Sequence, residues 1–161
     1  MMYLDANVFI YAACDQGEIG VAARKIITAV QIGIVPVFTS VLTYDEIVWG
    51  VRKMLGKEQS ILAGELFLSL PHLMVTEAKR ETISQAQKLI KEQNLKPRDA
   101  IHAATLLLAK QIDIISEDPD FDVLPSITRH TILSFAQTIA KKSTTVKKFN
   151  QKDALRYIRR L

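Results

Sequence analysis

The sequence has 161 residues, of which 48% are hydrophobic and 24% are charged, a composition typical of one compact soluble domain. Its single cysteine, Cys14, excludes an internal disulfide and a cysteine-rich zinc cluster. No apolar run is long enough to cross a membrane and the N-terminus lacks the basic segment of a signal peptide, so a cytoplasmic location is expected.

The net charge of +4 is unevenly distributed along the chain. Residues 141–161 contain eight Lys or Arg and one Asp, so they carry +7, whereas residues 1–140 carry −3. Two interpretations of this basic tail stay open: a solvated terminal segment, or a segment that attracts nucleic acid. The last residues of the tail, DALRYIRRL, could form a short amphipathic helix. We therefore divide the chain into a domain over 1–140 and a tail over 141–161.

Strand-like and helix-like segments alternate along the domain. The first strand is YLDA, whose end carries Asp5, and a helix that begins at Asn7 or Asp15 ends before Gly33. Further strands are expected at 34–40, 72–76, 111–116 and 129–133, and further helices at 40–55, 58–69, 79–93 and 98–110. This alternation predicts an α/β fold with three layers (α/β/α) around a central, mostly parallel sheet of four or five strands.

Carboxylates fall where such a fold places functional sites, at the carboxyl ends of parallel strands. Asp5 ends the first strand, and Asp118 and Asp120 follow the fourth. Asp99 opens the helix at 98–110, and Glu46 lies within the helix at 40–55. If these acids converge, their pKa values must rise or a cation must neutralise them. Carboxylate oxygens without cysteines suit Mg²⁺ or Mn²⁺ better than zinc.

Each acid also has an ordinary structural explanation. A helix N-terminus favours Asp99 after Pro97, and a turn around Pro119 accounts for its two neighbouring acids. Glu46 adjoins Asp45, and periodicity does not decide which of the two points inward. Asp5 is explained least well in this way, because a buried strand end seldom carries an unpaired charge.

Four segments in order, YLDANVFIY, TSVLTYDEIVWG, LKPRDAIHAATLLLA and IDIISEDPDFDVL, resemble the PIN-domain ribonucleases and, among them, VapC-like toxins. The resemblance covers roughly residues 2–133. It implies a PIN-like fold and an endoribonuclease that uses Mg²⁺ or Mn²⁺, with Asp5, Glu46, Asp99 and Asp118 as the catalytic and metal-binding acids. It also implies auxiliary roles for Asn7, Ser116 and Asp120. VapC-like proteins usually dimerise and are inhibited by an antitoxin whose tail enters the acidic groove.

Two other functions stay open at this point. The first is a catalytically silent module of the same fold that binds a protein or nucleic acid. The second is a haloacid-dehalogenase-like phosphatase, which needs a second Asp two positions after the first, where this chain has Asn7. The basic tail exceeds a minimal PIN domain, and its candidate RNA contacts are Lys147, Lys148, Arg156, Arg159 and Arg160.

Several other side chains have conventional interpretations. His102, three residues after Asp99, is interpreted as a packed core residue rather than a group that orients the carboxylate. Arg98 is interpreted as a solvated helix residue, and Trp49 and Tyr44 as core or dimer-surface residues rather than platforms for base stacking. The domain shows no dense basic patch beside its acids, which leaves the contacts to RNA open.

Overall fold

The computed structural model describes residues 1–143, with side chains described to Ala140. The tail therefore lies almost entirely outside the described residues. This includes the predicted terminal helix and all five candidate RNA contacts of the tail, which are Lys147, Lys148, Arg156, Arg159 and Arg160. Within the described part, no helix combines the length and apolarity needed to cross a bilayer.

Five short parallel strands form the sheet. They are β1 (Met2–Leu4), β2 (Val37–Ser40), β3 (Leu73–Thr76), β4 (Asp113–Ile115) and β5 (Thr128–His130), arranged in the order β3-β2-β1-β4-β5. In the register of the central strands, Tyr3 of β1 pairs with Phe38 of β2 and Ile114 of β4. The predicted α/β fold with a parallel sheet of four or five strands is confirmed.

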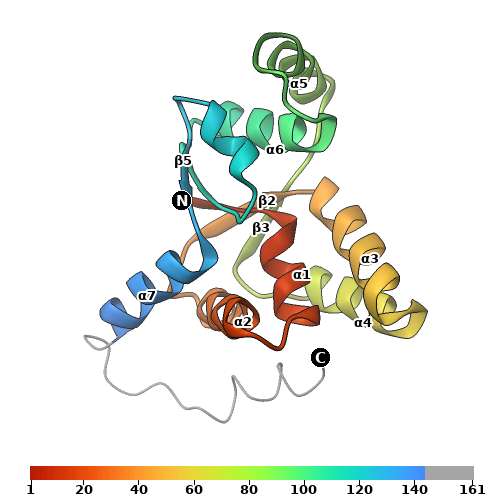
Figure 1. Cartoon of the computed structure of the whole chain (residues 1–161), viewed down its shortest axis with the longest axis vertical. Helices are drawn as coiled ribbons and strands as arrows, with labels where there is room; N and C mark the ends of the chain where they lie inside the picture. Colours follow the sequence, from red (N-terminus) through yellow and green to blue (C-terminus); the bar gives the residue numbers. More distant parts are fainter. Residues whose placement is uncertain (144–161) are drawn as a thin grey trace.

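Successive residues of the central strands enter two different cores, because side chains alternate between the faces of a strand. Leu4, Val37 and Ile115 belong to one core. Their neighbours Tyr3, Phe38 and Ile114 belong to the other. Figure 1 shows the resulting three layers, with helices on both faces of the sheet.

The two helical layers are unequal. The first core is covered by α1 (Ala6–Cys14), α2 (Glu18–Gln31), α3 (Leu42–Leu55), α4 (Lys57–Leu68) and α7 (Ile132–Ser143). The second is covered by α5 (Arg80–Gln93), α6 (Pro97–Leu108) and the 3₁₀ helix η1 (Pro119–Val123). As predicted, α2 ends just before Gly33 and α3 ends at Gly56, and both glycines have positive φ (72° and 91°).

The helix α7 was not predicted, and the fifth strand was predicted to run too far. β5 ends at His130 and α7 begins at Ile132, whereas the sequence interpretation continued the strand to residue 133. Ile132, Ala136 and Ile139 are buried at helical spacing, a signal that was present in the sequence. The Ile132 amide donates to the Glu117 carboxylate at 2.6 Å, so a distant loop supplies the acceptor that this helix start needs.

Candidate active site

Asp5 lies at the carboxyl end of β1, where the chain enters α1, and it is only 6% exposed. Its Oδ1 accepts a hydrogen bond from the Ala6 amide at 2.7 Å, which caps α1. Its Oδ2 accepts from the Asn7 side-chain amide and from the Ser116 hydroxyl, both at 2.6 Å. Ser116 follows β4, the strand beside β1, so the site stands where the strand order of the sheet reverses.

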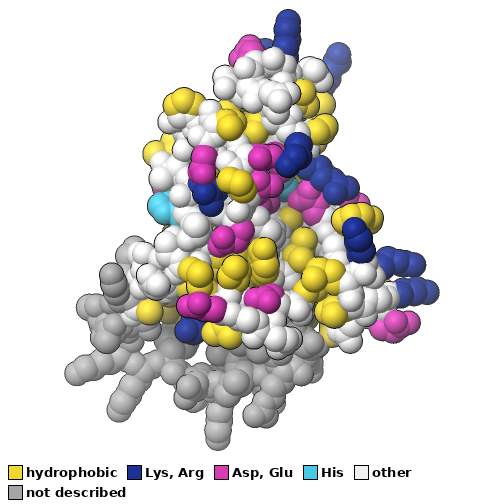
Figure 2. Space-filling view, in the orientation of Figure 1, with side chains coloured by type: hydrophobic (Ala, Val, Ile, Leu, Met, Phe, Trp, Pro, Cys, Tyr) yellow, Lys and Arg dark blue, Asp and Glu magenta, His cyan; other side chains and the backbone are white. Residues whose placement is uncertain are grey.

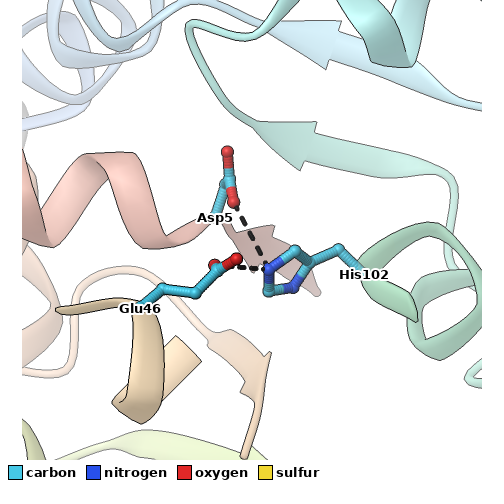
Figure 3. A group of neighbouring side chains, drawn as sticks. All are labelled: Asp5, Glu46 and His102. Atoms are coloured by element: carbon cyan, nitrogen blue, oxygen red, sulfur yellow. Dashed lines mark hydrogen bonds and ion pairs between the residues drawn. The ribbon is translucent and has the colours of Figure 1, made fainter. Parts of the chain in front are cut away.

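Glu46 is the member of the adjacent pair on α3 that points inward. Its side chain is 13% exposed, whereas that of Asp45 is 64% exposed. Its Oε2 lies 2.8 Å from Nε2 of His102, which comes from α6, and the same nitrogen lies 3.8 Å from Oδ1 of Asp5. Figure 3 shows the three side chains converging from three separate elements.

His102 is held on both ring nitrogens. It is 1% exposed, and its Nδ1 lies 2.6 Å from the hydroxyl of the buried Tyr3. The Ser40 amide donates to the same hydroxyl oxygen at 3.0 Å. The hydroxyl proton of Tyr3 can therefore go to Nδ1, so that neutral His102 donates from Nε2 to Glu46. This series of hydrogen bonds connects the end of β2 to the carboxylate of Glu46.

A second group of acids lies at the start of α6 and of η1. Asp99, Asp118 and Asp120 each offer one carboxylate oxygen, and these three oxygens lie within 4.8 Å of one another. Oδ1 of Asp118 accepts from the Asp120 amide at 2.9 Å. The Asp118 amide donates to the Ser116 hydroxyl at 3.0 Å, and the same hydroxyl donates to Asp5, so Ser116 links the two groups.

The pKa values tie these acids into one electrostatic site. The pKa of Asp99 is raised from 3.8 to about 6 by burial, by the charge of Asp118 and by that of Asp5. Burial also raises the pKa of Asp5, although His102 and Ser116 act against that rise. Burial alone would lower the pKa of His102, but its hydrogen bond to Glu46 and the charge of Asp5 outweigh burial and raise it.

This donor set fits a divalent cation with oxygen ligands. At neutral pH several carboxylates share a partly buried space, and a bound cation would offset their mutual repulsion. Apart from the imidazole of His102, the donors in the two groups are carboxylate oxygens, which suit Mg²⁺ or Mn²⁺.

Two basic side chains stand at the rim of the acids. Nζ of Lys96 lies 2.6 Å from the carboxylate of Asp120. Nε of Arg98 lies 3.6 Å from Glu46, and its Nη2 lies 3.5 Å from Asp45. Arg98 is half-exposed as expected, but it pairs with acids rather than only with solvent. Figure 2 shows the mixture of magenta and dark blue side chains in the hollow between α6 and α3.

All seven predicted site residues in the described part lie in this region, but they share it with two residues that the sequence interpretation left out. The prediction that His102 is buried was right, but its contacts with Glu46 and Asp5 were missed. Tyr3 was not considered as a site residue. Sequence spacing could have indicated both residues. His102 lies one helical turn after Asp99, and the alternation of side chains along a strand directs Tyr3 and Asp5 toward the same face.

Replacing Tyr3 by phenylalanine should destabilise the protein by about 1–3 kcal/mol, because the buried Ser40 amide and His102 Nδ1 would lose their partner. We expect the melting temperature to fall by roughly 5 °C in thermal denaturation. Tyr11→Phe is the matched control, since the Tyr11 hydroxyl makes no hydrogen bond within the described residues. Equal melting temperatures for the two variants would contradict the role given to the Tyr3 hydroxyl.

Other proteins of known structure have the same arrangement of strands and helices. Among the solved structures with a similar fold are the sarcin-ricin loop cleaving toxin VapC20 of Mycobacterium tuberculosis, a toxin–antitoxin complex from Klebsiella pneumoniae, and VapBC2 of Rickettsia felis bound to a DNA fragment from its promoter. Their TM-scores are 0.65, 0.57 and 0.62, at sequence identities of 15%, 20% and 18%. The alignments cover 76%, 80% and 81% of this chain and 93%, 96% and 98% of those chains. No curated protein sequence matches the chain significantly.

At these identities the three likenesses establish a shared fold and nothing finer. The family model gives more, because it compares the sequence itself. The model of the PIN domain matches residues 2–126, a span that contains β1 through β4 and every acid of the site. The chain therefore belongs to the PIN domain family.

Proposed function

We propose that this chain is a divalent-metal-dependent endoribonuclease of the VapC toxin type, which hydrolyses phosphodiester bonds of single-stranded or structured RNA in the cytoplasm. One observation carries the proposal: carboxylates from four separate segments form two neighbouring groups beside the central strands, and burial together with the charges of Asp118 and Asp5 raises the pKa of Asp99 to about 6. The similarity in fold to a toxin that cleaves the sarcin-ricin loop supports the same reaction class.

Asp5, Glu46, Asp99 and Asp118 would hold Mg²⁺ or Mn²⁺. When bound, such a cation supplies positive charge that activates water and stabilises the negative charge developing on the phosphate. Asn7 and Ser116 donate to Asp5 Oδ2 and so fix the orientation of that carboxylate. His102 would orient Glu46 in the same way, which makes it a positioning residue. Asp120 would have an auxiliary role, because its backbone amide donates to the Asp118 carboxylate.

The two rival functions are weighed by particular residues. A phosphatase that forms an aspartyl-phosphate would need an acid at position 7, and a carboxamide that donates to Asp5 cannot serve as a general acid. A catalytically silent module is the stronger rival, because the geometry of the acids is compatible with binding alone. RNA cleavage that requires the metal would distinguish a nuclease from that module, which would bind RNA or a protein without cleaving.

The test uses the full chain, freed of metal with EDTA and then supplied with Mn²⁺, on total cellular RNA and on a short labelled RNA strand. We expect internal cleavage only after Mn²⁺ is restored, with Mn²⁺ binding detected by calorimetry on the same preparation. Mn²⁺ binding without cleavage of either RNA would contradict the nuclease proposal. Absence of Mn²⁺ binding at millimolar concentration would favour the silent module.

Two partners belong to the same proposal, an antitoxin protein and a second copy of the chain. The antitoxin is supported by the similarity in fold to a chain from a toxin–antitoxin complex. Co-purification with the product of an adjacent reading frame tests the antitoxin, and light scattering tests the dimer.

A further inference from the structure

Trp49 is an exposed aromatic residue on the edge of the acidic site. It lies on α3 one turn after Glu46, and 55% of it is exposed. Of the two interpretations of Trp49, core residue or dimer-surface residue, this exposure excludes the first. An indole ring that keeps half its surface in water has apolar area available for a ligand. The charged groups around the ring indicate what kind of ligand it binds.

Two cations face this ring. Nζ of Lys53, one turn further along α3, lies 5.3 Å from the ring centroid. Cζ of Arg98 lies 5.7 Å from the same centroid. Both distances are typical of cation–π contacts. Arg98 also reaches the carboxylates of Asp45 and Glu46, so one guanidinium connects the indole ring to the acidic site.

We infer that Trp49, flanked by Arg98 and Lys53, binds an unpaired nucleobase of an RNA strand whose phosphodiester lies at the acids; this inference rests on the proposed function. Nucleobases stack on aromatic side chains in single-strand binding, and basic side chains beside the ring bind the neighbouring phosphates. A paired base is already stacked in its helix, so the platform favours single-stranded segments.

The charges around the ring favour RNA over a protein surface as its occupant. The centre of a protein–protein interface is depleted of charged residues, and lysine in particular is rare there. Here Lys53 and Arg98 both lie over the ring, and Arg98 pairs with Glu46 of the site. An occupant with a flat apolar face and negative charges on either side matches this pattern, and a nucleotide within a strand has both.

Trp49 is the only tryptophan of the chain, so the intrinsic fluorescence of the protein reports on this ring alone when excitation is at the red edge, where tyrosine does not absorb. We would titrate the full chain in EDTA, which keeps the RNA intact, with a short oligouridine. The comparison strands are an abasic strand of the same length and the same oligouridine in a duplex. We expect strong quenching by the single strand and little by the other two.

Two variants separate stacking from charge. Trp49→Leu should weaken oligouridine binding roughly tenfold in fluorescence anisotropy, and Trp49→Phe should retain most of the affinity. Equal quenching by the abasic strand, or equal affinity of the Leu variant, would overturn the inference. A change of fluorescence with protein concentration in the absence of RNA would also overturn it, because the ring would then lie between copies of the chain.

The binding experiment contains no metal, so its outcome does not depend on cleavage. If the protein cleaves RNA but its Trp49 fluorescence does not change with oligouridine, this inference is contradicted and the proposed function is not. Quenching that follows the predicted pattern, in a protein that cleaves no RNA with Mn²⁺, would support the platform and contradict the nuclease.

Discussion

Replacing Asp99 by asparagine is expected to reduce RNA cleavage by a factor on the order of 10²–10³ and, at the same time, to stabilise the metal-free protein. The loss of cleavage follows from removing one of four proposed metal-binding carboxylates. The gain in stability follows from the raised pKa of Asp99, which reports unfavourable burial and repulsion from Asp118 and Asp5. A neutral amide of similar shape experiences neither effect as strongly.

The sign of the pH dependence is determined by this pKa. Asp99 titrates near 3.8 in the unfolded chain and at about 6 in the metal-free fold, so between these values the folded protein binds more protons. Asp99 therefore lowers stability progressively as pH rises from about 4 to 6, and the whole loss is present at pH 7. Because the side chain is partly exposed, solvent screening reduces the loss to about 1–2 kcal/mol.

Thermal denaturation in EDTA measures this effect. At pH 7 the melting temperature of Asp99→Asn should exceed that of the wild type by about 4 °C, and near pH 4 the two should coincide. Asp122→Asn is the control, since the hydrogen bond from Arg129 lowers the pKa of Asp122, and its removal should not stabilise the protein. A less stable Asp99→Asn protein at pH 7 would contradict the repulsion that we describe among the acids.

The second large effect is expected from a pair of neighbours on α3. Glu46→Gln should lower cleavage by a factor on the order of 10², because an amide can still accept from His102 but binds a cation far less well than a carboxylate does. Asp45→Asn, one residue earlier, should change cleavage less than about threefold, because Asp45 is exposed and its contact with Arg98 is a surface ion pair.

The two variants should be compared for cleavage rate and for Mn²⁺ affinity on the same preparation. Both proteins should keep the wild-type circular dichroism spectrum, which excludes misfolding as the cause. If Glu46→Gln and Asp45→Asn lost cleavage equally, or if neither lost it, the inward carboxylate of α3 would have no part in the reaction. A selective loss for Glu46→Gln together with weaker Mn²⁺ binding is the result that we expect.

Local patterns were sufficient for most of the fold. The apolar run before Asp5, the alternation of strands and helices, and the glycines at 33 and 56 predict a parallel α/β domain, but the one helix expected before Gly33 is two helices in the structure, α1 and α2. These patterns failed at the C-terminal side of the sheet, where RHTIL looks like a strand throughout. The chain turns into α7 after His130 because Glu117, from the loop after β4, accepts the Ile132 amide. The sequence does not show this distant acceptor, although the helical spacing of Ile132, Ala136 and Ile139 could have indicated α7.

The candidate site shows the same division. Its acids could be named from the sequence, because strand ends, helix starts and the resemblance to PIN domains all point to Asp5, Glu46, Asp99 and Asp118. Periodicity could not decide between Asp45 and Glu46, since both positions border the apolar stripe of α3. Packing of α3 beside α6 decided it, by bringing His102 within 2.8 Å of Glu46.

By itself, the sequence determined the order of the five strands, most of the helices between them and the candidate acids, because these depend on propensity and spacing over a few residues. Only the tertiary structure decided how those acids are held. The path from the Ser40 amide through Tyr3 and His102 to Glu46 joins four elements, and each of its contacts depends on the packing of segments far apart in the chain. The same is true of Trp49, whose ring acquires a function only because α6 carries Arg98 to it.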